Sequence, residues 1–182
     1  MWSAQQRGLA VRAAHGLGGV PDDRALDALL RAEGLGVHER CPFGGRLREV
    51  YLGGVLGIRA GQPAGWVRWL KCHGLGHHLL HRGNRLYAEG KLYLWRRQEA
   101  EAELFAGTVL LGDVGPLRGP GALAREARVP LACARSWQAA LLLAHELDPA
   151  AGLGTPGPAL VQRPAGSARP VGARTLSCPP AD

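Results

Sequence analysis

Apolar residues recur three or four positions apart in several stretches of the chain, a spacing typical of amphipathic helices. In the first stretch Leu26, Leu29 and Leu30 follow Asp22, a residue type that caps helix N-termini, and the pattern stops at Gly34. This stretch predicts a helix over residues 22–33. The same spacing predicts further helices from Trp66 onward and over 99–111, 121–129 and 131–147, with Pro130 between the last two.

Between the first two predicted helices, the apolar residues lie in two short runs at 47–52 and 54–58. Both runs contain β-branched or aromatic residues, and Gly53 and Gly54 separate them, which favours two adjacent strands or an antiparallel hairpin. We therefore expect an α+β fold. In it, a small antiparallel sheet packs against the helix that begins near Trp66, and additional helices follow toward the C-terminus.

The last part of the chain, residues 149–182, differs in composition from the rest. It holds seven of the 13 prolines and no aromatic residue, and its apolar residues show no periodicity. Such a segment buries too little apolar surface to offset its ordering entropy. The sequence predicts one folded domain over residues 1–148 and a disordered tail over 149–182.

Charge, cysteine content and the lengths of apolar runs indicate which partners and which cellular location to expect. The 182 residues include 22 Lys and Arg against 15 Asp and Glu, and the formal net charge of +7 is compatible with an acidic or nucleic-acid partner. The 4 cysteines lie far apart, so no disulfide framework is predicted. No apolar run approaches the roughly 20 residues of a membrane span, and the N-terminal stretch has no signal-peptide core. We expect a cytoplasmic protein without a membrane segment.

Histidines concentrate in a short stretch that reads H-G-L-G-H-H-L-L-H. His73 and His77 are four positions apart, which on a helix places both imidazoles on one face and suits a shared ion such as Zn²⁺. His81 lies about 12 Å along the helix axis from His73, too far for the same ion, and His78 points about 100° away from His77. We expect both to lie outside the ligand set. The alternative is an exposed helix whose histidines are only solvated.

A third ligand has to come from another element. The predicted helix at 99–111 begins with Glu99, Glu101 and Glu103, and each is a candidate, although acidic residues also favour helix N-termini electrostatically. The residues alone leave the choice among the three open. Cys72 directly precedes the first histidine and faces another side of the helix, so we expect an ordinary buried thiol there.

Together, H-G-L-G-H-H-L-L-H and the later E-A-E-A-E-L-F-A-G-T-V-L-L resemble the ImmA/IrrE family of metallopeptidases from bacteria and their mobile elements, over about residues 20–145. The resemblance implies a zincin-like domain in which His73, His77 and Glu99 bind zinc, while Glu101 lies outside the ligand set. It also implies a protein partner. That partner would be a helix-turn-helix repressor or a similar regulator, which the protein cleaves or binds.

One position departs from the family pattern. Gly74 follows the first histidine, where an H-E-x-x-H enzyme carries the glutamate that acts as general base. General acid–base assistance contributes about 10²–10⁴-fold in rate, so we expect a weakened or inactive peptidase. Glu89 is a candidate replacement that no spacing supports. On this interpretation, Gly74→Glu should raise proteolysis of the partner far more than it changes zinc content.

A second function is open from the sequence. Residues 122–137 resemble the two-helix core of a helix-turn-helix DNA-binding module, with Arg125, Arg128 and Arg135 available to phosphates. The alternative for this segment is a pair of helices that only completes the domain core. The hypotheses are therefore a zinc peptidase, a zinc-binding relative that binds a regulator without rapid cleavage, and a DNA-binding regulator.

Overall fold

The computed structural model describes residues 2–45, 47–81, 92–114 and 118–147 of the chain. This part of the chain has a mixed α+β fold, as the sequence predicts. In chain order, its elements are α1 (Trp2–Ala14), α2 (Asp23–Ala32), β1 (Gly36–Cys41), β2 (Glu49–Leu52), β3 (Val55–Arg59), α3 (Ala64–Leu80), α4 (Leu92–Leu111), α5 (Pro120–Ala127) and α6 (Leu131–Leu147).

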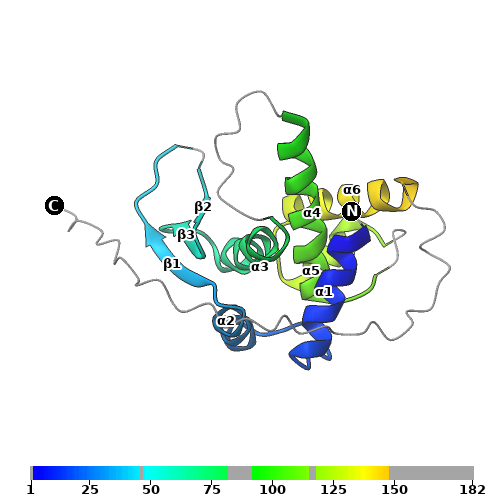
Figure 1. The fold of residues 1–182 in the computed structure, drawn as a ribbon, viewed down its shortest axis with the longest axis horizontal. Helices are drawn as coiled ribbons and strands as arrows, with labels where there is room; N and C mark the ends of the chain where they lie inside the picture. The colour runs from blue at the N-terminus through cyan, green and yellow to red at the C-terminus, as the bar shows by residue number, and fades with distance from the viewer. Residues whose placement is uncertain (1, 46, 82–91, 115–117, 148–182) are drawn as a thin grey trace.

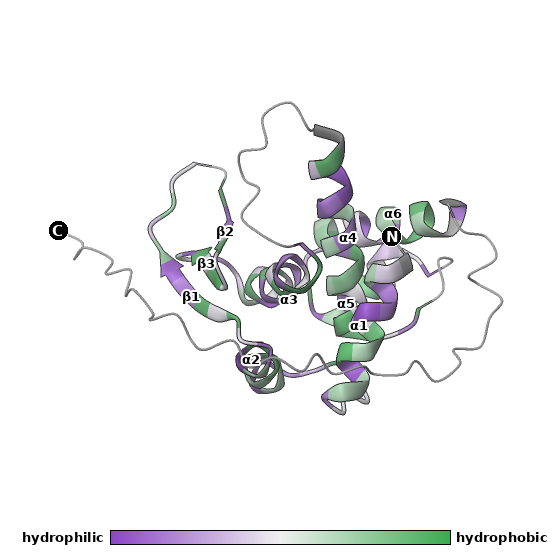
Figure 2. Cartoon of the chain, in the orientation of Figure 1, coloured by the Kyte–Doolittle hydropathy of each residue, from purple (hydrophilic) through white to green (hydrophobic). Residues whose placement is uncertain are grey.

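Helix α3 lies at the centre of the fold, between the sheet and α4 (Figure 1). Helices α1 and α6 pack on α4, α5 packs on α6, and α2 packs on α3. Figure 2 shows apolar residues on each of these helices, and the residues buried between the elements are mostly apolar. Leu56 of β3, Leu75 of α3 and Phe105 of α4 are fully buried members of the resulting core.

The sheet has the strand order β1-β3-β2, so β2 is an edge strand. Strands β2 and β3 form the predicted antiparallel hairpin, and its turn contains Gly53 and Gly54 at φ +56° and +85°, which glycine adopts without strain. The sheet as a whole is mixed rather than antiparallel, because β1 pairs in parallel with β3. Only Cys41 of β1 is buried, so this strand lacks the alternating pattern by which a sequence indicates a strand.

Helix α2 begins and ends within one residue of its predicted bounds. The carboxylate of Asp22 accepts a hydrogen bond from the backbone N–H of Ala25 at 2.7 Å, and the chain leaves the helix through Gly34 at φ +79°. Its three leucines, Leu26, Leu29 and Leu30, are buried as their spacing predicts.

Two helix starts were not predicted from the sequence. Helix α4 begins at Leu92, ahead of the predicted start at residue 99. Helix α1 was not predicted, because small residues make its contact with α4 and no regular spacing of large apolar residues marks it. A Cβ added to Gly8 would lie 2.9 Å from the Cβ of Thr108, so the two helices approach closely there, and Ala4 and Val11 are buried nearby on α1.

Two buried basic side chains on α3 join it to neighbouring elements. Arg68 pairs with Asp23 of α2 at 2.5 Å. Lys71 pairs with Asp27 of α2 at 2.6 Å and with Glu39 of β1 at 2.5 Å. Because a lone buried charge is costly, these pairs restrict rotation of α3 about its axis.

At the other end of the chain, Pro130 separates α5 from α6 as predicted, and Arg128 in the turn adopts φ +57°. The arginines singled out from the sequence, Arg125, Arg128 and Arg135, are exposed. Glu89 and the predicted tail over 149–182 lie outside the described residues. Among the helices that the structure describes, none combines the length and the apolar character needed to cross a membrane.

Candidate metal centre

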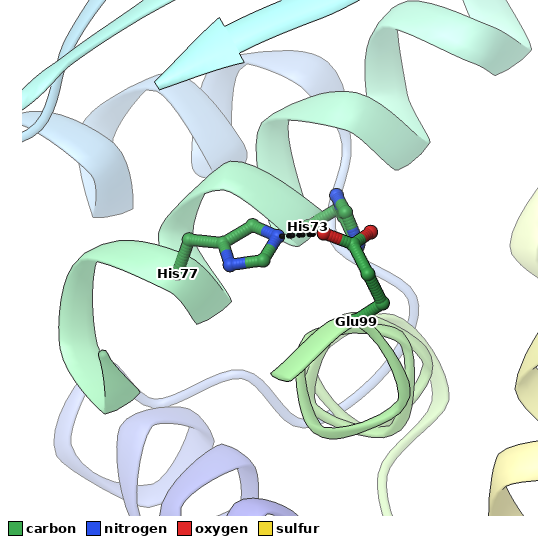
Figure 3. Close-up of side chains that lie close together, drawn as sticks. All are labelled: His73, His77 and Glu99. Carbon is green, nitrogen blue, oxygen red and sulfur yellow. Dashed lines mark ion pairs between the residues drawn. The ribbon is translucent and has the colours of Figure 1, made fainter. Parts of the chain in front are cut away.

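Helices α3 and α4 approach closely where small residues face each other. A Cβ added to Gly76 would lie 3.1 Å from the Cα of Ala102, which is fully buried. A larger residue at position 76 would push the helices apart. The close contact brings His73 and His77 on α3 alongside Glu99 on α4 (Figure 3).

The side chains of these three residues approach one another closely. They are the three residues that the resemblance to the ImmA/IrrE family implies as zinc ligands. Nε2 of His73 and Nε2 of His77 each lie 3.5 Å from an oxygen of the Glu99 carboxylate. One ligand atom from each residue lies within 4.8 Å of the other two. Tetrahedral zinc ligands at about 2.0–2.2 Å from the ion are about 3.3–3.6 Å apart. The group therefore has the donor types and the spacing to hold a metal ion.

A fourth side chain, Glu49 of β2, lies behind the first histidine. Its Oε1 is 2.6 Å from Nδ1 of His73, on the side of the ring away from Glu99. The carboxylate accepts the Nδ1 proton, which leaves Nε2 directed at the ligand group. Sequence reasoning missed Glu49, and its only signal was an acidic residue within the mostly apolar run at 47–52.

The second histidine has a longer chain of partners. Nδ1 of His77 lies 3.0 Å from Nδ1 of His81, and Nε2 of His81 lies 3.2 Å from a carboxylate oxygen of Glu101. Glu101 also accepts a hydrogen bond from Arg97 at 3.0 Å. A His81 ring that donates from Nε2 to Glu101 accepts at Nδ1 the hydrogen bond from the Nδ1 proton of His77. In that arrangement Nε2 of His77 carries no proton, and its lone pair is available to an ion. His81 and Glu101 lie outside the ligand group.

Electrostatics distinguish the two histidines. Burial by itself would lower the pKa of His73, but the surrounding carboxylates, Glu49 first among them, outweigh it and raise that pKa to about 9. Burial and the neighbouring imidazoles of His73 and His81 lower the pKa of His77 to about 3. Burial raises the pKa of Glu99. The excess of carboxylates around His73 favours a cation at this point.

The residues present fit a divalent metal of the zinc type. Two imidazoles and one carboxylate are a ligand set of catalytic zinc sites, in which a further position is left for water or substrate. Each imidazole has a hydrogen-bond partner at Nδ1, and both Nε2 atoms face the same carboxylate. Metal-binding histidines are oriented in this way by groups outside the ligand set.

Gly74, the residue after the first histidine, faces the sheet. A Cβ added there would lie 2.6 Å from Cδ2 of Leu56, a fully buried residue of β3. A glutamate at this position would first have to displace Leu56. The expectation that Gly74→Glu alone should raise proteolysis therefore omits a steric barrier that the sequence does not indicate.

Two further residues beside the ligands have other roles. His78 accepts or donates at Nδ1 with the hydroxyl of Tyr51 at 2.9 Å, and its Nε2 lies 3.1 Å from the carbonyl oxygen of Glu33. Both ring nitrogens are thus engaged away from the ligand group. Cys72 is buried, and burial raises the pKa of its thiol to about 12, as expected for an unreactive core cysteine.

Comparison of the chain with models of protein families, with curated proteins and with solved structures finds no match.

Proposed function

We propose that this protein binds zinc through His73, His77 and Glu99, and that it is a zincin-like relative of the ImmA/IrrE metallopeptidases without their usual general base. The observation that carries the proposal is the convergence of two imidazole Nε2 atoms on one carboxylate, each at 3.5 Å. The outer hydrogen bonds to Glu49 and His81 support it, because they direct both lone pairs toward the ion.

The chemistry available to the site follows from its residues. Bound zinc polarises a carbonyl group and lowers the pKa of water, which is how such sites hydrolyse peptide bonds. Leu56 fills the space beside Gly74 where a base would stand. We infer that the protein binds a regulatory protein, such as a helix-turn-helix repressor, and that it cleaves this partner slowly or not at all.

The test of the zinc site is the metal content of the purified, untagged protein, measured by elemental mass spectrometry. We expect about one zinc per chain in the wild type and almost none in His77→Ala, since three protein ligands are needed for a stable site of this kind. His38→Ala is the matched control, because His38 is exposed on β1. A wild type without zinc, or an equal zinc content in wild type and His77→Ala, contradicts the proposal.

A second candidate function is DNA binding by α5 and α6. Arg125 on α5, Arg135 on α6 and Arg128 in the turn between them are all exposed. This exposure favours DNA binding, since phosphate contacts need accessible guanidinium groups. Fluorescence anisotropy with duplex DNA at two salt concentrations tests it. DNA binding predicts an affinity that falls steeply with salt and falls further in Arg125→Ala and Arg135→Ala. Salt-independent or absent binding excludes this function.

A further inference from the structure

The edge strand β2 is attached to α3 through two side chains on one of its faces. Glu49 and Tyr51 are two positions apart, so both point to the same side of the strand. Glu49 bonds His73 at 2.6 Å, and Tyr51 bonds His78 at 2.9 Å. The tyrosine contact joins strand to helix through a residue outside the candidate ligand group. The glutamate contact is different, because its partner belongs to the candidate ligand group.

In the part of the chain that the structure describes, one of the two oxygens of the Glu49 carboxylate is left without a partner. Its Oε2 is buried and has no hydrogen-bond partner among the described residues, while Oε1 has His73. Burying a carboxylate is unfavourable unless a positive charge or several donors stabilise it. An ion held at Nε2 of His73 would place a positive charge on the opposite side of the imidazole ring that Glu49 contacts.

We propose, on the basis of the zinc site above, that Glu49 is a positioning residue of the metal centre. Its carboxylate accepts the Nδ1 proton of His73, holds the ring in the orientation that presents Nε2 to the ion, and increases the basicity of that nitrogen. His73 is 6% exposed, so this interaction acts in a weakly screened environment. An acidic partner behind a metal-binding histidine typically changes metal affinity by about 10–100-fold.

The test compares zinc dissociation constants of the full chain, obtained by competition with a chromophoric chelator. Glu49→Gln keeps an oxygen that accepts the Nδ1 proton and loses only the charge, whereas Glu49→Ala loses both. We expect weakening by about 10-fold in Glu49→Gln and by up to about 100-fold in Glu49→Ala. Glu126→Gln is the matched control, because Glu126 lies on α5 and pairs with Arg118. It should bind zinc as the wild type does.

Cobalt substitution separates positioning from a general structural role. The visible ligand-field bands of bound Co²⁺ should change in Glu49→Ala and stay unchanged in Glu126→Gln, with equal helical circular dichroism in all variants. Equal zinc affinity in the wild type and both Glu49 variants overturns the assignment, as does weakening of similar size in Glu126→Gln. A wild type that binds no zinc instead overturns the proposed function, and with it any role for Glu49 at a metal.

Discussion

At the scale of single residues, two histidines one helical turn apart carry opposite electrostatic shifts. His73 lies among carboxylates and has a pKa raised to about 9, whereas His77 lies between imidazoles and has a pKa lowered to about 3. Near neutral pH, His73 is therefore positively charged in the metal-free protein, whereas His77 is neutral. Only His73 has to lose a proton before its Nε2 can bind an ion.

This difference predicts how zinc binding depends on pH. Zinc uptake at neutral pH should release about one proton from the two imidazoles, so affinity should rise about tenfold per pH unit from pH 7. The rise should level off near pH 9, where His73 is already deprotonated. Calorimetric titration in two buffers of different ionisation enthalpy measures the proton, and chelator competition measures the affinity. A flat pH profile from 7 to 9 contradicts the prediction.

Gly74 provides a prediction about stability. In Gly74→Ala, the new methyl group meets Leu56, and overpacking of this kind costs about 1–3 kcal/mol, against a gain of about 1 kcal/mol in helix propensity. We expect a net loss of up to about 2 kcal/mol in the free energy of unfolding. In a Leu56→Ala background the same substitution should be stabilising, because the collision is gone. Denaturant titration of the wild type, the two single variants and the double variant measures the free energies of unfolding. If Gly74→Ala lowers this free energy equally in the wild type and in the Leu56→Ala background, Leu56 is not the obstacle.

At the scale of elements, the junctions of α4 depend on small residues. The Gly76–Ala102 contact sets its distance from α3, and the ring of Trp137 on α6 occupies the space where a Cβ at Gly107 would lie. Trp137 is 1% exposed and has no room to move outward without opening the core. The position of Glu99 thus depends on glycines and alanines that carry no chemistry themselves.

The α4–α6 junction predicts a strongly destabilised variant. Gly107→Ala should lower the free energy of unfolding by about 3 kcal/mol or more, because the indole of Trp137 has to leave its site. Gly121→Ala on α5 is the control: the nearest atom to its new Cβ is Nη1 of Arg125 at 3.7 Å, so stability should change by less than about 1 kcal/mol. Urea unfolding followed by circular dichroism compares the two, and equal effects contradict the close contact.

At the scale of the whole molecule, the candidate site connects three elements of the fold. The candidate ligands come from α3 and α4, and Glu49 adds β2. On the other side of α3, the pairs of Arg68 and Lys71 join it to α2 and β1. A bound ion would therefore stabilise the arrangement of α3, α4 and β2 relative to one another rather than that of one loop.

Zinc should accordingly raise the melting temperature. At a free zinc concentration 100 times the dissociation constant, the native state gains about 2.7 kcal/mol, which for a chain of this size corresponds to about 5–10 °C. His77→Ala should show no such shift, and chelator should return the wild type to the metal-free value. Differential scanning fluorimetry makes the comparison. A similar shift in His77→Ala would mean that zinc acts elsewhere on the protein.

Several features of the protein could be predicted from the sequence, because they depend on neighbours close along the chain. The bounds of α2 follow from Asp22, its leucines and Gly34. The shared face of His73 and His77 follows from helical periodicity alone. The choice of Glu99 among three glutamates came from the family resemblance, and the structure brings that residue to both histidines.

Other features were decided only by tertiary structure, because they depend on residues far apart along the chain. The parallel pairing of β1 with β3 joins residues that no local pattern connects. Glu49 meets His73 across 24 positions because β2 packs against α3. Leu56 blocks the space at Gly74 because the neighbouring strand β3 also packs against α3. The periodicity of the backbone is a local property that the sequence determines by itself, whereas the environment of each ligand arises from how separate elements pack together.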